Sequence, residues 1–187
     1  MFILYAIPIG IVAGYLLGGR LERLGRIRFR WAALALLGLA VQIVLFSDPL
    51  AETVGANGPP IYVASTALVL VAVLRNLDIP GIAVVALGAC SNLAAIVANG
   101  GYMPADPAAV KAIGGAAPGY SNGSVVGDPA LGPLTDIFAL PAWVPFANVF
   151  SVGDLLIGMG VAITIVLGMR PDRAEKPGGT RDQRAAG

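Results

Sequence analysis

The chain has 187 residues, of which 57% are hydrophobic and 12% are charged, and its formal net charge is +1. A soluble domain carries about a quarter of charged residues, so this composition, with a mean hydropathy of +0.80, indicates an integral membrane protein. The small net charge excludes nucleic acid as a partner, because no basic excess is present to neutralise phosphates.

Histidine is absent and Cys90 is the only cysteine. Their scarcity excludes Ser-His-Asp and Cys-His catalysis, CxxC redox chemistry and zinc sites built from these residues. Cys90 lies in an apolar segment and is interpreted as a small packing residue. Any catalysis would use carboxylates, hydroxyls, Lys111 or a carboxylate-bound metal. We predict neither a metal site nor a cofactor.

Five apolar segments predict five membrane-spanning helices, since a span needs about 20 mostly apolar residues. The segments are Phe2–Gly19, Trp31–Phe46, Ile61–Leu74, Ile79–Ala98 and Asn148–Met169. In the first segment, small residues recur at every fourth position and form a face that another helix can approach closely. We expect that helix to belong to the same chain rather than to a second copy. The small residues are Ala6, Gly10, Gly14 and Gly18.

The basic residues predict the orientation, because short cytoplasmic loops are enriched in Lys and Arg. Five arginines lie between positions 20 and 30, Arg75 follows the third segment, and five basic residues lie in 170–187; only Lys111 lies on the opposite side. The sequence predicts a cell-membrane protein with an outer N-terminus and a cytoplasmic C-terminus. Residues 1–169 form its membrane domain, with an outer loop at 100–147, and 170–187 form a disordered tail. Orientation alone, or contact with anionic lipid, explains the arginine-rich first loop.

The outer loop contains signals of local order. "DPAAVKAIGG" predicts a short helix with Asp106 as its N-cap and Gly114 at its end. "GYSNGSVVGDP", at 119–129, predicts turns or a hairpin. In "LPAWVPFANVF", the aromatic residues Trp143, Phe146 and Phe150 are spaced as an interfacial anchor before the last segment.

Two aspartates on the predicted outer side are the candidate catalytic residues. Asp154 lies in "SVGD", which fits a capping box with Ser151 as N-cap, so a structural role explains it. Asp136 lies in "GPLTDIFALP", where a turn after Pro133 also explains it. Two aspartates that converge can instead share a proton and act as acid and base.

Asparagines and a serine near the same surface are the candidate substrate-binding residues. Asn92 needs a partner within its apolar segment, either through a hydrogen bond between helices, with Ser91 beside it, or through a ligand. Asn99 opens "NGGYMP", which closes the fourth segment. With Ser151, these residues complete the predicted site.

The combination "NGGYMP … LTDIF … FSVGDLLIGMG" resembles an uncharacterised family of small multi-pass bacterial membrane proteins. This resemblance implies a class and a compartment but no activity. "SNLAAIVANGG" and "FSVGDLLIGMG" are also distantly similar to motifs of lipoprotein signal peptidase (signal peptidase II). That likeness implies that Asn92 matches a motif asparagine and that Asp154 matches one catalytic aspartate.

The chain departs from the peptidase pattern at several positions, and Ser151 replaces the motif asparagine that precedes the matched aspartate. Ala95 and Ile96 replace an Asp-Arg pair, and Pro104 stands where the other catalytic aspartate is expected. A peptidase therefore requires Asp136 to have taken over that role.

The sequence as a whole predicts an all-α membrane protein, a five-transmembrane-helix bundle with a long extracytoplasmic loop. Its outer face is predicted to bind membrane lipid, a lipoprotein or another membrane protein, without catalysis. The alternative is a signal-peptidase-II-like aspartyl hydrolase using Asp136 and Asp154. Transport is disfavoured, because no charged residue lies inside the predicted spans apart from Asp154 near one end.

Overall fold

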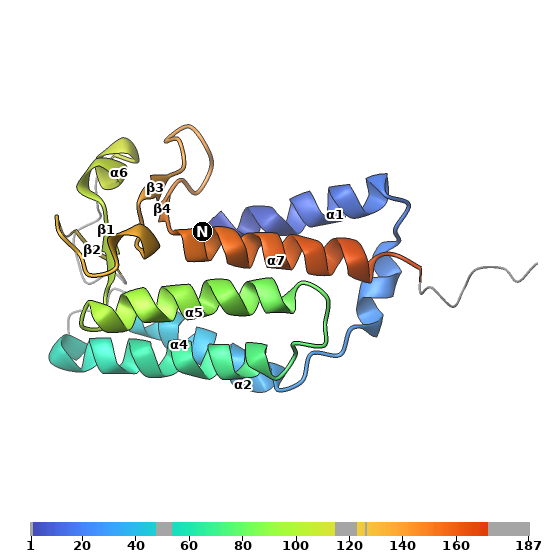
Figure 1. Ribbon diagram of the computed structural model, residues 1–187, viewed down its shortest axis with the longest axis horizontal. Helices are drawn as coiled ribbons and strands as arrows, with labels where there is room; N and C mark the ends of the chain where they lie inside the picture. Colours follow the sequence, from blue (N-terminus) through green and yellow to red (C-terminus); the bar gives the residue numbers. More distant parts are fainter. Residues whose placement is uncertain (1, 48–53, 115–122, 126, 172–187) are drawn as a thin grey trace, which may run out of the picture.

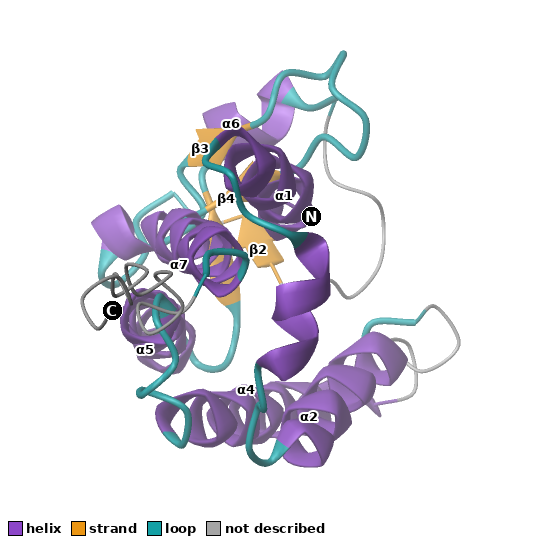
Figure 2. Ribbon diagram, turned by 90° about the vertical axis from the view of Figure 1, so that its right-hand side faces the viewer, coloured by secondary structure: helices purple, strands orange, loops and turns teal. Residues whose placement is uncertain are grey.

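The computed structural model describes residues 2–47, 54–114, 123–125 and 127–171. Five helices carry the architecture: α1 (Ala6–Leu16), α2 (Ala32–Leu45), α4 (Gly58–Leu74), α5 (Ile82–Ala98) and α7 (Val152–Gly168). They lie side by side in the order α2, α4, α5, α7, α1, each packing against the next (Figures 1 and 2). The described residues also form four short 3-10 helices: η1 (Phe2–Tyr5), η2 (Leu21–Arg26), η3 (Gly55–Asn57) and η4 (Gly132–Leu134).

The five helices form at the predicted places, but the predicted five-transmembrane-helix bundle is wrong. Within the described residues, no helix combines the length and the apolar character that crossing a membrane requires. The longest helices have 17 residues each. At about 1.5 Å per residue, such a helix is roughly 26 Å long, shorter than a hydrocarbon core of about 30 Å. The fold is mostly helical, with two small two-stranded sheets.

Backbone breaks shorten the helices relative to the apolar runs that contain them. Gly18 has a φ of 76° and ends the first helix, and the N–H of Gly19 donates to the carbonyl of Gly14 at 2.8 Å. Gly81, with a φ of 92°, delays the start of α5 to Ile82. Gly101, with a φ of 89°, closes α5 through a 2.8 Å bond from its N–H to the carbonyl of Ile96.

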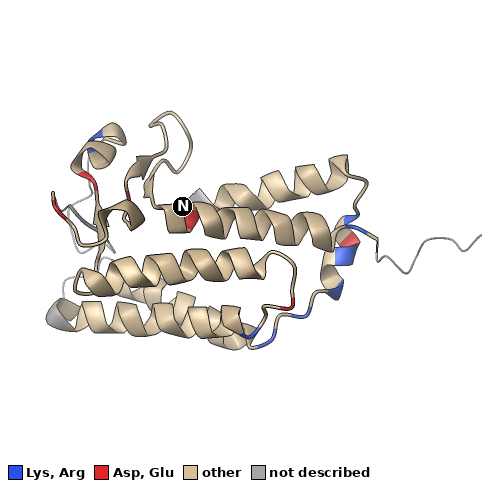
Figure 3. Ribbon diagram, in the orientation of Figure 1, with Lys and Arg blue, Asp and Glu red and all other residues tan. Residues whose placement is uncertain are grey.

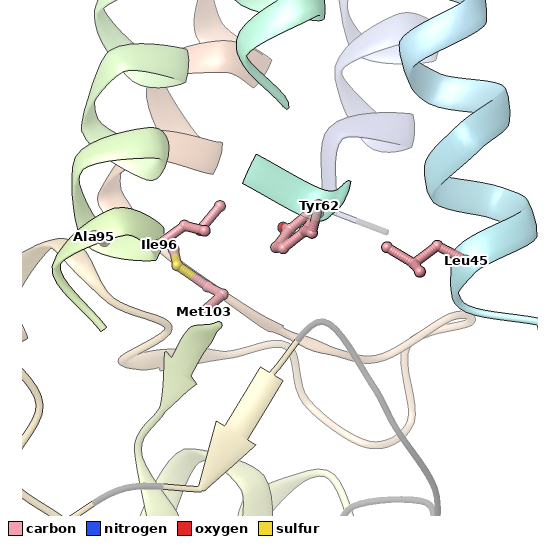
Figure 4. Packing of buried hydrophobic residues seen from close by; sticks show 5 residues of the cluster. All are labelled: Leu45, Tyr62, Ala95, Ile96 and Met103. Atoms are coloured by element: carbon pink, nitrogen blue, oxygen red, sulfur yellow. The ribbon is translucent and has the colours of Figure 1, made fainter. Parts of the chain in front are cut away.

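One buried cluster joins α2, α4 and α5 to the end of the molecule that carries the loops. Met103, in strand β1 (Met103–Ala105), points its side chain toward Ile96 of α5 (Figure 4). Tyr62 lies in the same cluster and packs edge-on against Phe46, with ring centroids 5.0 Å apart. The cluster is made up of Leu45, Tyr62, Ala95, Ile96 and Met103.

Glycines allow α7 to approach its two neighbours closely. On the antiparallel helix α5, a Cβ at Gly160 would lie 2.7 Å from the backbone nitrogen of Val85. On the parallel helix α1, a Cβ at Gly10 would lie 3.2 Å from the Cα of Ala162. Gly14 likewise packs on Met169, so the small-residue face of the first helix is used within the chain, as predicted.

The described residues between 100 and 150 form short elements over one end of the helices (Figure 1). β1 pairs in parallel with β2 (Gly123–Val125), and β3 (Phe138–Ala139) pairs antiparallel with β4 (Val149–Phe150). Helix α6 (Pro107–Ala112) has Asp106 as its N-cap, which confirms that prediction. Of the predicted turns at 119–129, residues 119–122 and 126 lie outside the described residues, as do 172–187 of the predicted tail.

The charged residues gather at the two ends of the helices. Arginines lie on η2, on the segment that follows it and at the ends of α4 and α7, whereas the loop-bearing end carries Asp106, Asp136 and Asp154 (Figure 3). Arg30 reaches across that first end to Asp78, with 2.9 Å between nitrogen and oxygen. The long sides of the helices between these ends are almost free of charge (Figure 3).

Substitution of Gly160 by alanine should destabilise the protein. Alanine in a helix is otherwise favoured over glycine by up to about 1 kcal/mol. Here its Cβ would lie 2.7 Å from the Val85 nitrogen and 2.8 Å from the Gly81 oxygen, so we expect a net loss of ~1–3 kcal/mol. Gly25→Ala is the matched control, because a Cβ there meets nothing within 4 Å. Thermal unfolding measures both variants, and equal midpoints would contradict the close α5–α7 contact.

Candidate functional site

The candidate site lies where the C-terminal part of α5 meets the start of α7. Gly153 lies directly against α5: a Cβ there would approach the Cγ of Asn92 to 2.6 Å and the carbonyl oxygen of Gly88 to 2.7 Å. Because nothing larger than a hydrogen atom separates the two backbones at this point, Asn92 is held beside the first turn of α7. Ser151 and Asp154, on either side of Gly153, lie within reach of its amide.

Asn92 bridges these two side chains. Its Nδ2 donates to the Oδ1 of Asp154 at 2.8 Å, and its Oδ1 accepts from the Oγ of Ser151 at 2.8 Å. The predicted hydrogen bond between helices therefore forms, and its partners lie on α7. Ser151 is fully buried, so its hydroxyl depends on these protein partners.

Ser151 and Asp154 also form the predicted capping box. The backbone N–H of Asp154 donates to Ser151 Oγ at 3.0 Å, and the backbone N–H of Ser151 donates to Asp154 Oδ2 at 3.3 Å. Both oxygens of Asp154 thus have partners, one from the cap and one from Asn92. The structural explanation of Asp154 is confirmed. The same carboxylate also belongs to the hydrogen-bonded group of Asn92, Ser151 and Asp154, which together with the nearby Asp136 we call the polar network.

Asp136 reaches this place through two strand pairings. Its N–H donates to the carbonyl of Pro104 at 2.9 Å and its carbonyl accepts from the N–H of Asp106 at 3.0 Å, which ties it to β1. Two residues later, Phe138 pairs with Phe150, and the two rings stack with centroids 5.4 Å apart. Since β4 leads directly into Ser151, this register carries Asp136 toward the start of α7.

The carboxyl group of Asp136 is buried and electrostatically coupled to Asp154. The residue is 9% exposed, and its Oδ1 has no hydrogen-bond partner among the described residues. Burial, and after it the negative charge of Asp154, raises the pKa of Asp136 from 3.8 to about 7. The two aspartates predicted as a pair therefore lie close enough to influence each other, and Asp136 holds its proton up to neutral pH.

Asn99 lies apart from this network. Its Nδ2 donates to the carbonyls of Ala95 and Ala130, each at 2.8 Å, and its Oδ1 accepts from the N–H of Ala130 at 2.9 Å. These bonds fasten the segment at Ala130 to the end of α5. The structure thus brings together Asn92, Ser151, Asp154 and Asp136, and it gives Asn99 a different, loop-anchoring place.

A groove beside the network was not predicted from the sequence. It has a volume of about 210 Å³ and runs between the start of α1 and the first turns of α7. The only feature of the sequence that could have indicated this groove is the small residues on both helices. Small residues let two helices approach closely, and such a contact leaves a shallow surface beside it. Its lining residues are Tyr5, Ala6, Ile9, Leu155, Gly158, Met159 and Ala162.

The connection between β3 and β4 contacts Tyr5, which lines this groove. The hydroxyl of Tyr5 donates to the carbonyl of Pro145, which fastens that connection to η1. Of the predicted aromatic anchor, Trp143 is 84% exposed and Phe146 is 74% exposed, whereas Phe150 stacks inside the hairpin. Among the described residues, no three acidic or cysteine side chains gather as metal ligands.

The free energy of unfolding should fall as the pH rises from about 4 to about 7. Asp136 keeps its proton in the folded protein up to a pKa of about 7, whereas in the unfolded chain it releases the proton near pH 3.8. The contribution of Asp136 to the free energy of unfolding is complete below pH 3.8 and lost above about pH 7. Between these values the free energy of unfolding falls by roughly one kcal/mol per pH unit. Asp136→Asn should remove this slope in denaturant titrations, while Asp128→Asn, at an exposed carboxyl, should keep it. Parallel curves for the wild type and Asp136→Asn would contradict the burial of this proton.

Comparison with known proteins places the chain in a family. No curated protein and no solved structure matches it. A model described as a family of unknown function (DUF5317) matches residues 26–166, which is well over half of the chain. The matched range contains α2, α4, α5 and all four residues of the polar network, and it begins after α1. The chain therefore belongs to the family of unknown function DUF5317.

Proposed function

We propose that this protein binds the acyl chain of a lipid, or of a lipid-modified protein, in the groove between α1 and α7. The observation that carries the proposal is the position of this groove. Leu155, one of its lining residues, directly follows Asp154, so the apolar groove begins in the same first turn of α7 that carries the Asp154 carboxyl group. A molecule with an apolar chain and a polar head would match an apolar groove that has a polar network near one end.

The size and chemistry of the groove favour a narrow apolar chain. Its volume of about 210 Å³ is below the roughly 300–1,000 Å³ typical of pockets for drug-sized ligands. Its lining is aliphatic except for Tyr5, whose hydroxyl is already bonded to Pro145. A ligand with polar groups along its length would lose hydrogen bonds to water there without replacing them.

The surroundings of the groove are also apolar. α1 carries large apolar side chains that are more than half exposed, and Trp143 and Phe146 are exposed on the neighbouring connection. Clusters of this kind on a protein surface mark sites of interaction with lipid or with other proteins. On α1 these exposed residues are Ile9, Val12, Tyr15 and Leu16, and Leu17 directly follows the helix.

A charge introduced into the groove should weaken acyl-chain binding. Ile9 lines the groove and is 60% exposed, so Ile9→Asp places a carboxylate against the ligand without disturbing the core. Losing the burial of one such side chain costs ~1.5–3 kcal/mol, which corresponds to about tenfold or more in affinity. Val12→Asp is the matched control, because Val12 is 58% exposed on the same helix and does not line the groove.

The measurement is the titration of the purified protein with a fluorescent long-chain fatty acid. The proposal predicts that Ile9→Asp weakens binding and that Val12→Asp leaves it within twofold. Equal weakening by both substitutions would indicate adsorption to the apolar surface in general and would reject the groove. Unchanged binding by Ile9→Asp would reject it as well.

A second candidate, an aspartyl hydrolase, is supported by the position of Asp136. Its backbone N–H bonds to the carbonyl of Pro104, the residue that stands where lipoprotein signal peptidase would be expected to carry its other catalytic aspartate. Asp136 thus lies beside the position of that aspartate, in an isolated bridge to β1. A protonated Asp136 beside the Asp154 carboxylate provides the acid and the base that such hydrolysis needs, with Asn92 positioning the substrate.

The hydrolase predicts a specific loss of activity on a lipoprotein precursor. Asp136→Asn and Asp154→Asn should each abolish processing without lowering the abundance of the protein, and the wild-type rate should fall above about pH 7 as Asp136 ionises. Asp106→Asn is the matched control, since Asp106 caps a helix in the same region. Processing that survives Asp136→Asn would eliminate this candidate and leave the binding function alone.

A further inference from the structure

A second pocket lies at the opposite end of α7 from Asp154. It has a volume of about 250 Å³ and is lined by three arginines, two from η2 and one that follows α7. Its apolar walls come from the end of α7, from the segment after η2 and from the turn before α5. Arg23, Arg26 and Arg170 are the basic residues, with Ile27, Pro80 and Leu167 beside them.

Short contacts between η2 and the end of α7 hold this pocket in shape. The carbonyl of Met169 accepts from the backbone N–H of Arg20 at 2.8 Å and from the Nη1 of Arg23 at 3.3 Å. A Cβ at Gly168 would lie 2.6 Å from the Cδ1 of Ile27, so the two segments are in direct contact. The arginines therefore project from a packed junction of secondary structure.

The charges at this end do not balance. Among the described residues there, seven arginines face two carboxylates, Glu22 and Asp78, and Asp78 is already paired with Arg30. Figure 3 shows the same excess of basic residues on η2 and on the segment after it. The C-terminal end of α7 adds only about half of a negative charge. The seven are Arg20, Arg23, Arg26, Arg28, Arg30, Arg75 and Arg170.

We infer that this pocket binds a phosphate-bearing anion, with Arg23, Arg26 and Arg170 around the phosphate. Guanidinium groups match the geometry of phosphate oxygens and donate pairs of charge-assisted hydrogen bonds to them. The volume suits a phosphate group or a small head group, since larger ligands occupy pockets of roughly 300 Å³ or more. Free inorganic phosphate and the phosphate of a lipid head group share this chemistry. The site is separate from the groove beside Asp154 and does not depend on the function proposed there.

Arginine substitutions that differ only in position test this inference. Arg26→Gln and Arg170→Gln each remove a lining charge, whereas Arg28→Gln removes an equal charge from an exposed arginine outside the pocket. Two probes are used: inorganic phosphate, followed by calorimetric titration, and vesicles of phosphatidylglycerol compared with phosphatidylcholine, followed by sedimentation. Unchanged thermal midpoints establish that the variants are folded, and having two pocket variants keeps the test decisive if one of them is not.

We expect Arg26→Gln and Arg170→Gln to weaken binding about tenfold and Arg28→Gln to leave it within twofold. If phosphate shows this pattern, the ligand is a free anion; if only the phosphatidylglycerol vesicles show it, the ligand is a lipid head group. Equal weakening by all three substitutions would assign binding to the general positive field and overturn the inference. Absence of binding to both probes would overturn it too.

Discussion

The contact between α5 and α7 is the constraint on which the rest of the molecule depends. Gly88 and Gly153 form one close approach, and Gly81 and Gly160 form another about two turns away. These two contacts fix how the antiparallel helices are aligned along their axes and how closely their backbones approach. α4 then packs on the far side of α5, and α1 packs on the other face of α7, so every other helix takes its position from this pair.

The same contact couples stability to chemistry at the candidate site. Ser151 begins α7, satisfies its free N–H groups and donates to Asn92, so one hydroxyl serves both the helix cap and the polar network. Asp136 is different, because its burial beside Asp154 raises its pKa and lowers stability at neutral pH. Groups that reduce stability without a packing benefit are typical of functional sites, although structural networks produce them too.

Local patterns predicted much of this arrangement. The five helices, the Asp106 cap and the capping box of Ser151 and Asp154 all depend on residues within a few positions of one another, which a sequence displays directly. The need of Asn92 for a partner was also visible, because a polar side chain in an apolar helix has to be satisfied. The identity of that partner was not, since it depends on the depth of the glycine contact.

Two kinds of information were beyond the sequence. The first and fourth apolar runs overestimated the lengths of their helices, because positive φ angles at Gly18 and Gly81 interrupt the backbone without making the runs less apolar. The isolated bridge between Asp136 and Ala105 joins segments that lie far apart in the chain, in a register that no local pattern records. The overestimated helix lengths led to the wrong fold class. The missing register meant that the sequence could not show whether Asp136 and Asp154 lie close together.

The order of helices in space has a consequence for how the chain folds during synthesis. α2 and α4 are near neighbours in sequence, and Gln42 bonds to Thr66 only 24 residues later. By contrast, Asn92 and its partner Asp154 are 62 residues apart in the chain, and Tyr5 and its partner Pro145 are 140 residues apart. Contacts of such separation form slowly, and apolar surface awaiting them is prone to aggregation. Because α1 packs on α7, which follows it by well over a hundred residues, we expect the apolar surface of α1 to stay uncovered until α7 is synthesised.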